Sequence, residues 1–249
     1  MNARTILIEG AVDSELSALI ERFKPEGVHE MGGGWRVLTC DMAGGRVALL
    51  NTGVGVANAA AATALACAAL NPAAVISQGT AGAHDISLHT GDVVVGTRIL
   101  RLGAYRSPAR EHGVAPLEWQ MLDQSGDTGP VREYASDVRL AKAARTALTE
   151  RGYGQAGNPR ALDGTIGSGD VWNCEFDMIA HLNARYGTAC EEMETYSAAS
   201  VCDRMGVPFL SLRVISNNER IGESYAPEVA AQLQRAVGDI AEALVKGET

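Results

Sequence analysis

The sequence is poor in positive charge. It carries 21 lysine and arginine residues against 30 aspartate and glutamate residues, which gives a formal net charge of −9 at pH 7. A surface that binds nucleic acid or an acidic membrane needs the opposite balance, because its ligand is a polyanion. We therefore expect neither of these as a partner.

Long apolar runs and metal-binding patterns are also missing. No stretch reaches the ~20 apolar residues that spanning a bilayer requires, and the apolar run near the N-terminus, Thr5 to Ile8, is too short for a secretion signal. The five cysteines show neither a Cys-x-x-Cys pair nor the Cys/His spacing of a metal site. We expect reduced thiols in a cytoplasmic protein, with no metal and no cofactor.

What the sequence does contain is a regular alternation of short apolar strands and helices. Its 249 residues are 46% hydrophobic and 20% charged, as is ordinary for a globular enzyme. No linker or repeat interrupts them, so we expect one domain over residues 1–249. A hairpin predicted from Trp35–Cys40 and Arg46–Asn51 adds antiparallel strands. The predicted fold class is α/β, with a mixed central sheet between two layers of helices.

Local signals give the bounds of several elements. A helix is predicted over Glu15–Phe23, capped by Asp13 or Ser14, and a second over Val138–Arg151, capped by Asp137. A buried strand over Ala74–Gln78 is expected to end in a turn of small residues, 79–83. The glycines of Gly53-Val54-Gly55 match a dinucleotide fingerprint poorly, and close packing of helix on sheet explains them better.

The most informative stretch runs from residue 186 to 219. Three glutamates lie between a short apolar run and an alanine-rich helix predicted over Thr195–Met205. A buried strand follows at 209–216, contains a single arginine, and ends in two asparagines. Because ligands bind beyond the carboxyl ends of such strands, these polar groups can meet in one polar pocket of an otherwise apolar protein. The residues concerned are Glu191, Glu192, Glu194, Arg213 and Asn217.

The same stretch resembles a known signature. Glu192-Met193-Glu194 and Arg213-Val214-Ile215-Ser216 are similar to the ribose- and base-binding residues of the nucleoside phosphorylase and nucleosidase superfamily. The most similar branch is that of the 5′-methylthioadenosine/S-adenosylhomocysteine nucleosidases. The resemblance implies a nucleoside phosphorylase-like fold, a hydrolytic purine nucleosidase, a small purine nucleoside as its ligand, and a homodimer.

Three further segments match this branch in the same order. Gly10–Glu15 resembles its first active-site loop, Gly79–Ala83 its small-residue turn beside the sugar, and Gly167–Asn173 its base-stacking segment. On its own, Glu15 could merely complement a helix dipole, and Trp172 could be a core residue. By resemblance, Trp172 stacks on the purine and the backbone of the next residue reads the base edge. The implied substrate contacts are Thr80, Ala81, Gly82, Val171, Trp172, Asn173, Glu192, Met193 and Ser216.

The chemistry of nucleoside cleavage needs such groups. The C1′–N9 bond breaks through an oxocarbenium-like sugar, which a nearby carboxylate stabilises. Glu194 suits this task through hydrogen bonds to the 2′- and 3′-hydroxyls, and Glu15 suits the task of activating water as a general base. Arg213 either orients Glu194 or the water, or neutralises buried glutamates for structural reasons, and the two roles are compatible.

Asn217 departs from the branch, which has an aspartate at this position. An asparagine cannot give a proton to the leaving base, so a neighbouring acid, Asp170 or Glu219, is a candidate donor. The amide also suits a 6-oxopurine base, as in futalosine hydrolases and in phosphorylases of 6-oxopurines. A nucleoside-binding protein without activity is a further alternative. A phosphorylase is less favoured because Gly10–Glu15 and Gly79–Ala83 contain no arginine to hold phosphate.

Residues 101–135 show little periodicity. A loop of this length in a compact domain is often a lid or an oligomer contact. Its candidates for enclosing the 5′ substituent are Tyr105, His112, Trp119 and Met121.

Overall fold

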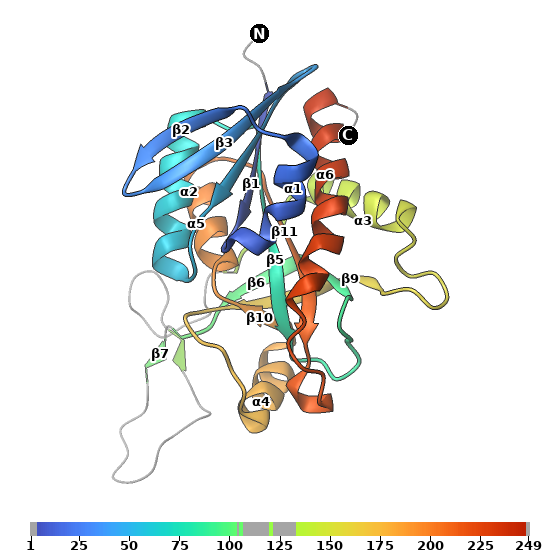
Figure 1. The fold of residues 1–249 in the computed structure, drawn as a ribbon. Helices are drawn as coiled ribbons and strands as arrows, with labels where there is room; N and C mark the ends of the chain where they lie inside the picture. Colours follow the sequence, from blue (N-terminus) through green and yellow to red (C-terminus); the bar gives the residue numbers. More distant parts are fainter. Residues whose placement is uncertain (1–3, 104, 107–119, 122–132, 248–249) are drawn as a thin grey trace.

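The computed structural model describes residues 4–103, 105–106, 120–121 and 133–247, and shows an α/β fold built on a nine-stranded sheet (Figure 1). The strands lie in the order β10-β9-β6-β11-β5-β1-β4-β3-β2. Their bounds are β1 Arg4–Gly10, β2 Gly27–Gly32, β3 Trp35–Met42, β4 Gly45–Asn51, β5 Ala74–Ala83, β6 Val93–Arg101, β9 Ala161–Ser168, β10 Thr188–Glu192 and β11 Phe209–Asn217. Two short strands, β7 (Tyr105–Arg106) and β8 (Gln120–Met121), pair with each other.

The sheet is mixed, as predicted. Strand β5 runs parallel to β1 and β11, whereas β2, β3 and β4 pair antiparallel and β6 lies antiparallel to β11. Strand β10 pairs with β9 on one side and with the end of β5 on the other. The five strands β5, β11, β6, β9 and β10 therefore form a closed ring at one end of the sheet.

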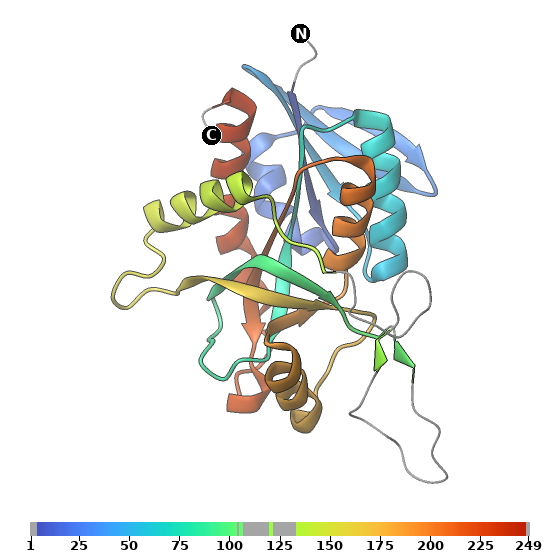
Figure 2. The ribbon, with the colours of Figure 1, turned by 180° about the vertical axis from the view of Figure 1, so that it is seen from behind.

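Helices cover both faces of the sheet, which gives the predicted three layers. Figures 1 and 2 show α2 and α5 on one face, with α1, α3 and α6 on the other. Each face has its own core because successive strand residues point to opposite sides: Ile6 and Ile8 pack with α1, α3 and α6, and Leu7 packs with α2 and α5. The helices are α1 Ser17–Phe23, α2 Val56–Leu70, α3 Val138–Glu150, α4 Phe176–Tyr186, α5 Thr195–Met205 and α6 Ala230–Lys246.

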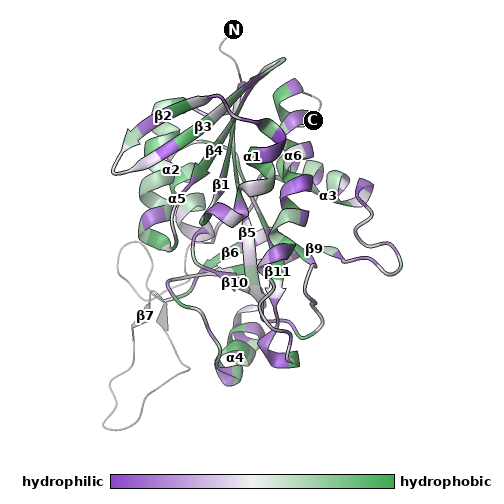
Figure 3. Cartoon of the chain, viewed as in Figure 1, coloured by the Kyte–Doolittle hydropathy of each residue, from purple (hydrophilic) through white to green (hydrophobic). Residues whose placement is uncertain are grey.

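The helices that cover the sheet are amphipathic. Figure 3 shows hydrophobic and hydrophilic residues alternating along α3 and α6. Helix α3 begins as predicted, because the Asp137 carboxylate accepts hydrogen bonds from the backbone N–H groups of Arg139 and Leu140.

Two local predictions need correction, and one strand was missed. Residues 79–83 are not a turn, because β5 continues to Ala83 and pairs with β11 and β10 on its two sides. Glu15 does not open the first helix: it ends a short 3-10 turn, Asp13–Glu15, without a side-chain cap, and α1 starts at Ser17. Strand β2, with its mostly exposed residues, has no apolar pattern and was not predicted.

Most of the segment 101–135 lies outside the described residues, as do His112 and Trp119; the backbones of Tyr105 and Met121 are described within β7 and β8. All five cysteines have free thiols. None of the helices in the described part of the chain is long and apolar enough to cross a membrane.

Candidate active site

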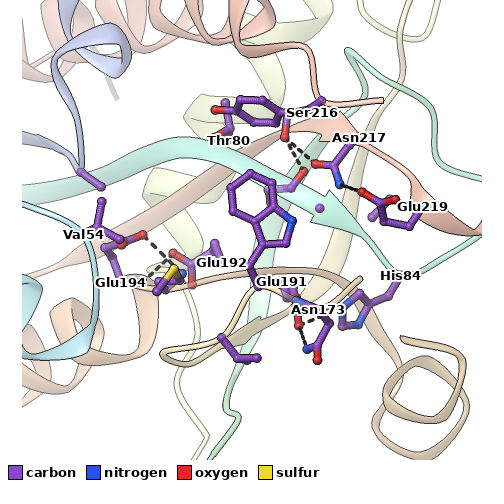
Figure 4. Close-up of a pocket in the computed structure, with 18 of the residues that line it drawn as sticks. Val54, Thr80, His84, Asn173, Glu191, Glu192, Glu194, Ser216, Asn217 and Glu219 are labelled. Atoms are coloured by element: carbon purple, nitrogen blue, oxygen red, sulfur yellow. Dashed lines mark hydrogen bonds and ion pairs between the residues drawn. The ribbon is translucent and has the colours of Figure 1, made fainter. Parts of the chain in front are cut away.

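A cavity of about 190 Å³ opens where β5, β10 and β11 end, beside the loop after β1 and the start of α5 (Figure 4). All the predicted site residues except Arg213 line it: Glu15, Thr80, Ala81, Gly82, Val171, Trp172, Asn173, Glu192, Met193, Glu194, Ser216 and Asn217. Glu15 and Glu194 thus share one cavity bordered by Trp172. Arg213 lies behind it and lines a smaller space that Glu194 also borders.

Strand pairing brings the polar groups of the cavity together. Gly82 on β5 is paired with Asn217 of β11 on one side and with Glu191 of β10 on the other. Strand β11 bulges between Ile215 and Asn217. A side chain added at Gly82 would contact the Asn217 amide at 3.4 Å. The glycine therefore leaves the cavity floor beside the Asn217 amide without a side chain.

Glu15 is held in the cavity by backbone and hydroxyl donors. Its Oε1 accepts from the Thr80 N–H at 2.7 Å and from the Thr80 hydroxyl at 3.1 Å, and its Oε2 accepts from the Ala11 N–H at 2.9 Å. Gly79 makes this possible, since a Cβ atom there would stand 2.6 Å from Oε1. The Thr80 N–H thus positions this acid.

Glu194 stands at the start of α5. Its Oε1 accepts from the backbone N–H of Gly55 at 2.8 Å, and its Oε2 lies 3.3 Å from the N–H of Met193. Burial, together with the neighbouring charge of Glu192, raises the pKa of Glu194 to about 8. Gly55, at φ +96°, adopts a conformation that favours glycine. The Gly53–Gly55 segment therefore contributes to the site, in addition to the packing that was predicted for it.

Glu192 and Arg213 form a buried ion pair with Nη2 and Oε2 2.7 Å apart. Burial alone would raise the pKa of Glu192, but the charge and hydrogen bonds of Arg213, with the backbone N–H groups of Glu194 and Thr195, hold it below its ordinary value. Arg213 also donates to the Ser77 hydroxyl. Its direct partner is therefore Glu192, and it acts on Glu194 only through this neighbour and through its charge.

Asn217 is surrounded by polar groups. Its Nδ2 donates to Glu219 Oε1 at 3.2 Å, and its Oδ1 lies 2.9 Å from the Ser216 hydroxyl. Of the two acids considered as proton donors, Glu219 lines the cavity. Asp170 instead accepts from the backbone N–H of Val56, at the start of α2.

Trp172 lines the cavity and is exposed to solvent. Its side chain is 58% exposed, so it is not a core residue. Its ring meets Tyr225 edge to face, with centroids 5.3 Å apart. This pair forms an apolar wall against which a planar base can stack.

The cavity also contains a polar cluster that was not predicted from the sequence. Figure 4 shows Glu191 grouped with Asn173 and His84, apart from the group of Ser216, Asn217 and Glu219. Val54 and Tyr225 also line the cavity without having been predicted. Their sequence signals are weak, because each is a single residue outside a recognisable motif.

Within the described ranges there is no group of three or more His, Cys, Asp or Glu side chains that could hold a metal ion.

The known proteins that are similar to this chain belong to one superfamily. The family model described as the Phosphorylase superfamily matches residues 5–246. A 5′-methylthioadenosine/S-adenosylhomocysteine nucleosidase of Halalkalibacterium halodurans is 31% identical over 175 residues, 70% of this chain and 68% of that protein.

Solved structures are also similar. The 5′-methylthioadenosine/S-adenosylhomocysteine nucleosidase of Neisseria meningitidis, in complex with methylthio-immucillin-A, is 25% identical to this chain. Its TM-score is 0.75, over 96% of this chain and 99% of that protein's chain. The futalosine hydrolase of Helicobacter pylori, at 18% identity, shares the fold with a TM-score of 0.75 over 95% of this chain and 98% of its own. The chain belongs to the phosphorylase superfamily, in the branch of the 5′-methylthioadenosine/S-adenosylhomocysteine nucleosidases.

Proposed function

We propose that this protein hydrolyses the N-glycosidic bond of 5′-modified purine nucleosides of the methylthioadenosine and adenosylhomocysteine type, releasing the free purine and the sugar. The observation that carries the proposal is the meeting of Glu15 and Glu194 in one cavity bordered by Trp172. Family membership supports the same reaction.

In this reaction Glu194 holds the 2′- and 3′-hydroxyls of the sugar. As positive charge develops at C1′, the ionised carboxylate stabilises it. Arg213 acts as a positioning residue, because its ion pair with Glu192 anchors the start of α5 from which Glu194 projects.

Glu15 directs the attacking water. Its carboxylate is oriented by Thr80 and Ala11, and an ionised carboxylate in this position can accept a proton from water as the water attacks C1′. The departing base is met by Asn217, which can donate an N–H, and Glu219 is the adjacent acid that can supply a proton.

Hydrolysis is preferred to phosphorolysis because of the charge of the cavity. The described residues that line it include five glutamates and no lysine or arginine: Glu15, Glu191, Glu192, Glu194 and Glu219. Of these, Glu192 is neutralised by Arg213. A phosphate dianion would be repelled here. A rate that depends strongly on added phosphate, with a sugar 1-phosphate as product, would contradict hydrolysis.

A nucleoside-binding protein without activity is a second candidate, favoured by Asn217, which cannot protonate the base. It predicts tight binding of purine nucleosides with no release of base, even after Asn217→Asp. The hydrogen bonds that hold Glu15 in the cavity speak against this second candidate. A protein that only binds nucleosides does not need a general base that activates water.

The direct test is parallel incubation with methylthioadenosine, adenosylhomocysteine, inosine and futalosine, with free base followed by chromatography. Release of adenine from methylthioadenosine or adenosylhomocysteine, abolished by Glu15→Gln, is the expected result. No release from any of the four would refute the proposal.

We further propose that the protein works as a homodimer in the cytoplasm. Exposed apolar side chains near the cavity, among them Val54, Trp172 and Phe176, support a partner surface at this face. Light scattering after size-exclusion chromatography would measure the mass, for which one chain is 26.1 kDa.

A further inference from the structure

The loop 169–175, between β9 and α4, carries Trp172 and has no anchor in the hydrophobic core. Every residue from 170 to 175 is exposed or half-buried, and none belongs to a core cluster. A loop that buries so little apolar surface opens at a low cost in free energy. Within this chain, its polar bonds to the neighbouring elements therefore decide where Trp172 stands.

Two such attachments flank Trp172. Before it, the Asp170 carboxylate accepts from the backbone N–H of Val56 at 2.8 Å. After it, the backbone N–H of Asn173 donates to Glu191 Oε1 at 2.7 Å, and the Asn173 side-chain amide donates to Oε2. Asp170 is exposed, whereas Glu191 is buried. A hydrogen bond to a carboxylate is stronger where water is kept away from it, so Glu191 provides the stronger attachment.

Glu191 is itself held firmly. Its backbone lies in β10, paired with Gly167 of β9 on one side and with Gly82 of β5 on the other. Its side chain has His84 beside it, with Nε2 3.1 Å from Oε2. The His84 ring is fixed in turn, because it is buried and its Nδ1 lies 2.7 Å from the Thr188 hydroxyl. The exposed loop is thus bonded to a rigid part of the sheet.

The bond stabilises both partners. A buried carboxylate is costly unless donors surround it, and no lysine or arginine is among the described residues that line the cavity. Asn173 supplies two donors to Glu191. Moving the loop away would remove both of them at once and leave the carboxylate short of partners. The position in which Trp172 borders the cavity is therefore the favoured one.

We propose that Glu191 is a positioning residue that holds Trp172 in place to stack on the base of the substrate. It acts through Asn173 and the loop, and has no part in the chemistry at the sugar. The proposal rests on the proposed function for the identity of the ligand. An aromatic ring that is already fixed loses little conformational entropy when the base binds, and this raises affinity.

The first test is Glu191→Leu, which removes both acceptors and keeps a side chain of similar size. Stacking stabilises the bound substrate and the transition state alike. The KM for methylthioadenosine is therefore expected to rise about tenfold, with kcat changed by less than about twofold. Glu150→Leu, at an exposed glutamate at the end of α3, is the matched control and should change neither constant. A lower kcat at unchanged KM, which a loss of folded enzyme would give, would overturn the proposal.

Asn173→Ala keeps the test decisive if Glu191→Leu does not fold. It removes only the bond to Oε2, at a half-buried position of the loop. A smaller rise in KM, again at nearly constant kcat, is expected. An unchanged KM in this variant would contradict the role of Glu191.

A double-mutant cycle with Trp172→Ala shows whether Glu191 acts through this ring. Once the indole is removed, Glu191→Leu is expected to raise KM no further, because the two changes then disrupt the same contact. If the two effects on KM multiply instead, Glu191 influences binding independently of Trp172 and the proposal fails.

The position of Trp172 can also be measured without a ligand. Subtracting the emission spectrum of Trp172→Phe isolates the fluorescence of Trp172, which is 58% exposed and packs against Tyr225. Release of the loop in Glu191→Leu is expected to increase quenching of this emission by acrylamide about 1.5-fold. Equal quenching in the two proteins would overturn the proposal. Because no substrate is involved, this result stands even if methylthioadenosine is not cleaved, the outcome that would refute the proposed hydrolysis.

Discussion

Glu9, on β1, is a buried acid whose ionisation should weaken the fold. Its side chain is 2% exposed, and neither carboxyl oxygen has a well-formed hydrogen bond among the described residues. Burial raises the pKa of Glu9 from an ordinary 4.5 to about 7, although the Thr63 hydroxyl and the charge of Arg213 offset part of the rise. The folded protein therefore holds this proton more tightly than the unfolded chain does.

The direction of the effect follows from proton linkage. Between pH 4.5 and 7 the folded state binds more protons than the unfolded state, so the free energy of unfolding falls as pH rises. The stability that the protonated group contributes is fully present below pH 4.5 and is lost as pH rises through 7. At about 1.4 kcal/mol per pH unit, the total is about 3 kcal/mol, of which about 2.5 kcal/mol is lost between pH 5 and 8.5.

The perturbation is Glu9→Gln, which keeps the shape and removes the charge. Urea unfolding of both proteins at pH 5 and pH 8.5 measures the free energy of unfolding. Relative to wild type, the variant should gain about 2.5 kcal/mol between these two pH values. Glu150→Gln, at an exposed glutamate, controls for the loss of one negative charge. A difference between wild type and Glu9→Gln that is the same at both pH values would refute the reasoning.

Three further outcomes are expected. Because the pKa of Glu194 is raised to about 8 and the ionised form is needed, kcat/KM should rise about tenfold per pH unit up to pH 8 and then level off; a profile that is flat from pH 6 to 9 would contradict this role. Gly79→Ala should lower kcat by at least about a hundredfold with little change in substrate binding, since its Cβ would displace Glu15 from a position only 2.6 Å away; kinetics with wild-type rates would show that Glu15 is not needed in this place. Arg213→Met should destabilise the fold by about 3–5 kcal/mol in urea unfolding, because it leaves Glu192 charged and buried; adding Glu192→Gln should recover part of that loss, and a double variant no more stable than the single one would argue against the pair.

Much of the fold could be predicted from the sequence, because its strands and helices carry strong local patterns. The bounds of α5 and the cap of α3 agree with the prediction. The extension of β5 could not be predicted, since Gly-Thr-Ala-Gly-Ala has the composition of a turn. Pairing with β10 and β11 on both sides holds these residues in a strand, and that pairing is a tertiary effect.

In the site, too, local motifs could be predicted from the sequence, whereas contacts between distant segments could not. Motifs of contiguous residues located Glu15, Trp172 and Glu194, which do line one cavity. The cluster of His84 and Glu191 was not recognised, because these residues are far apart in sequence and meet only where β5 and β10 pair. Likewise, the sequence could place Arg213 near the glutamates but could not show which of them it contacts.

The ring of β5, β11, β6, β9 and β10 has a consequence for motion during turnover. Every strand beneath the base is hydrogen-bonded to a neighbour on either side, so displacing any one of them would break two ladders at once. Substrate entry and product release are then expected at the rim of the cavity, where Trp172 and Tyr225 stand on two separate loops.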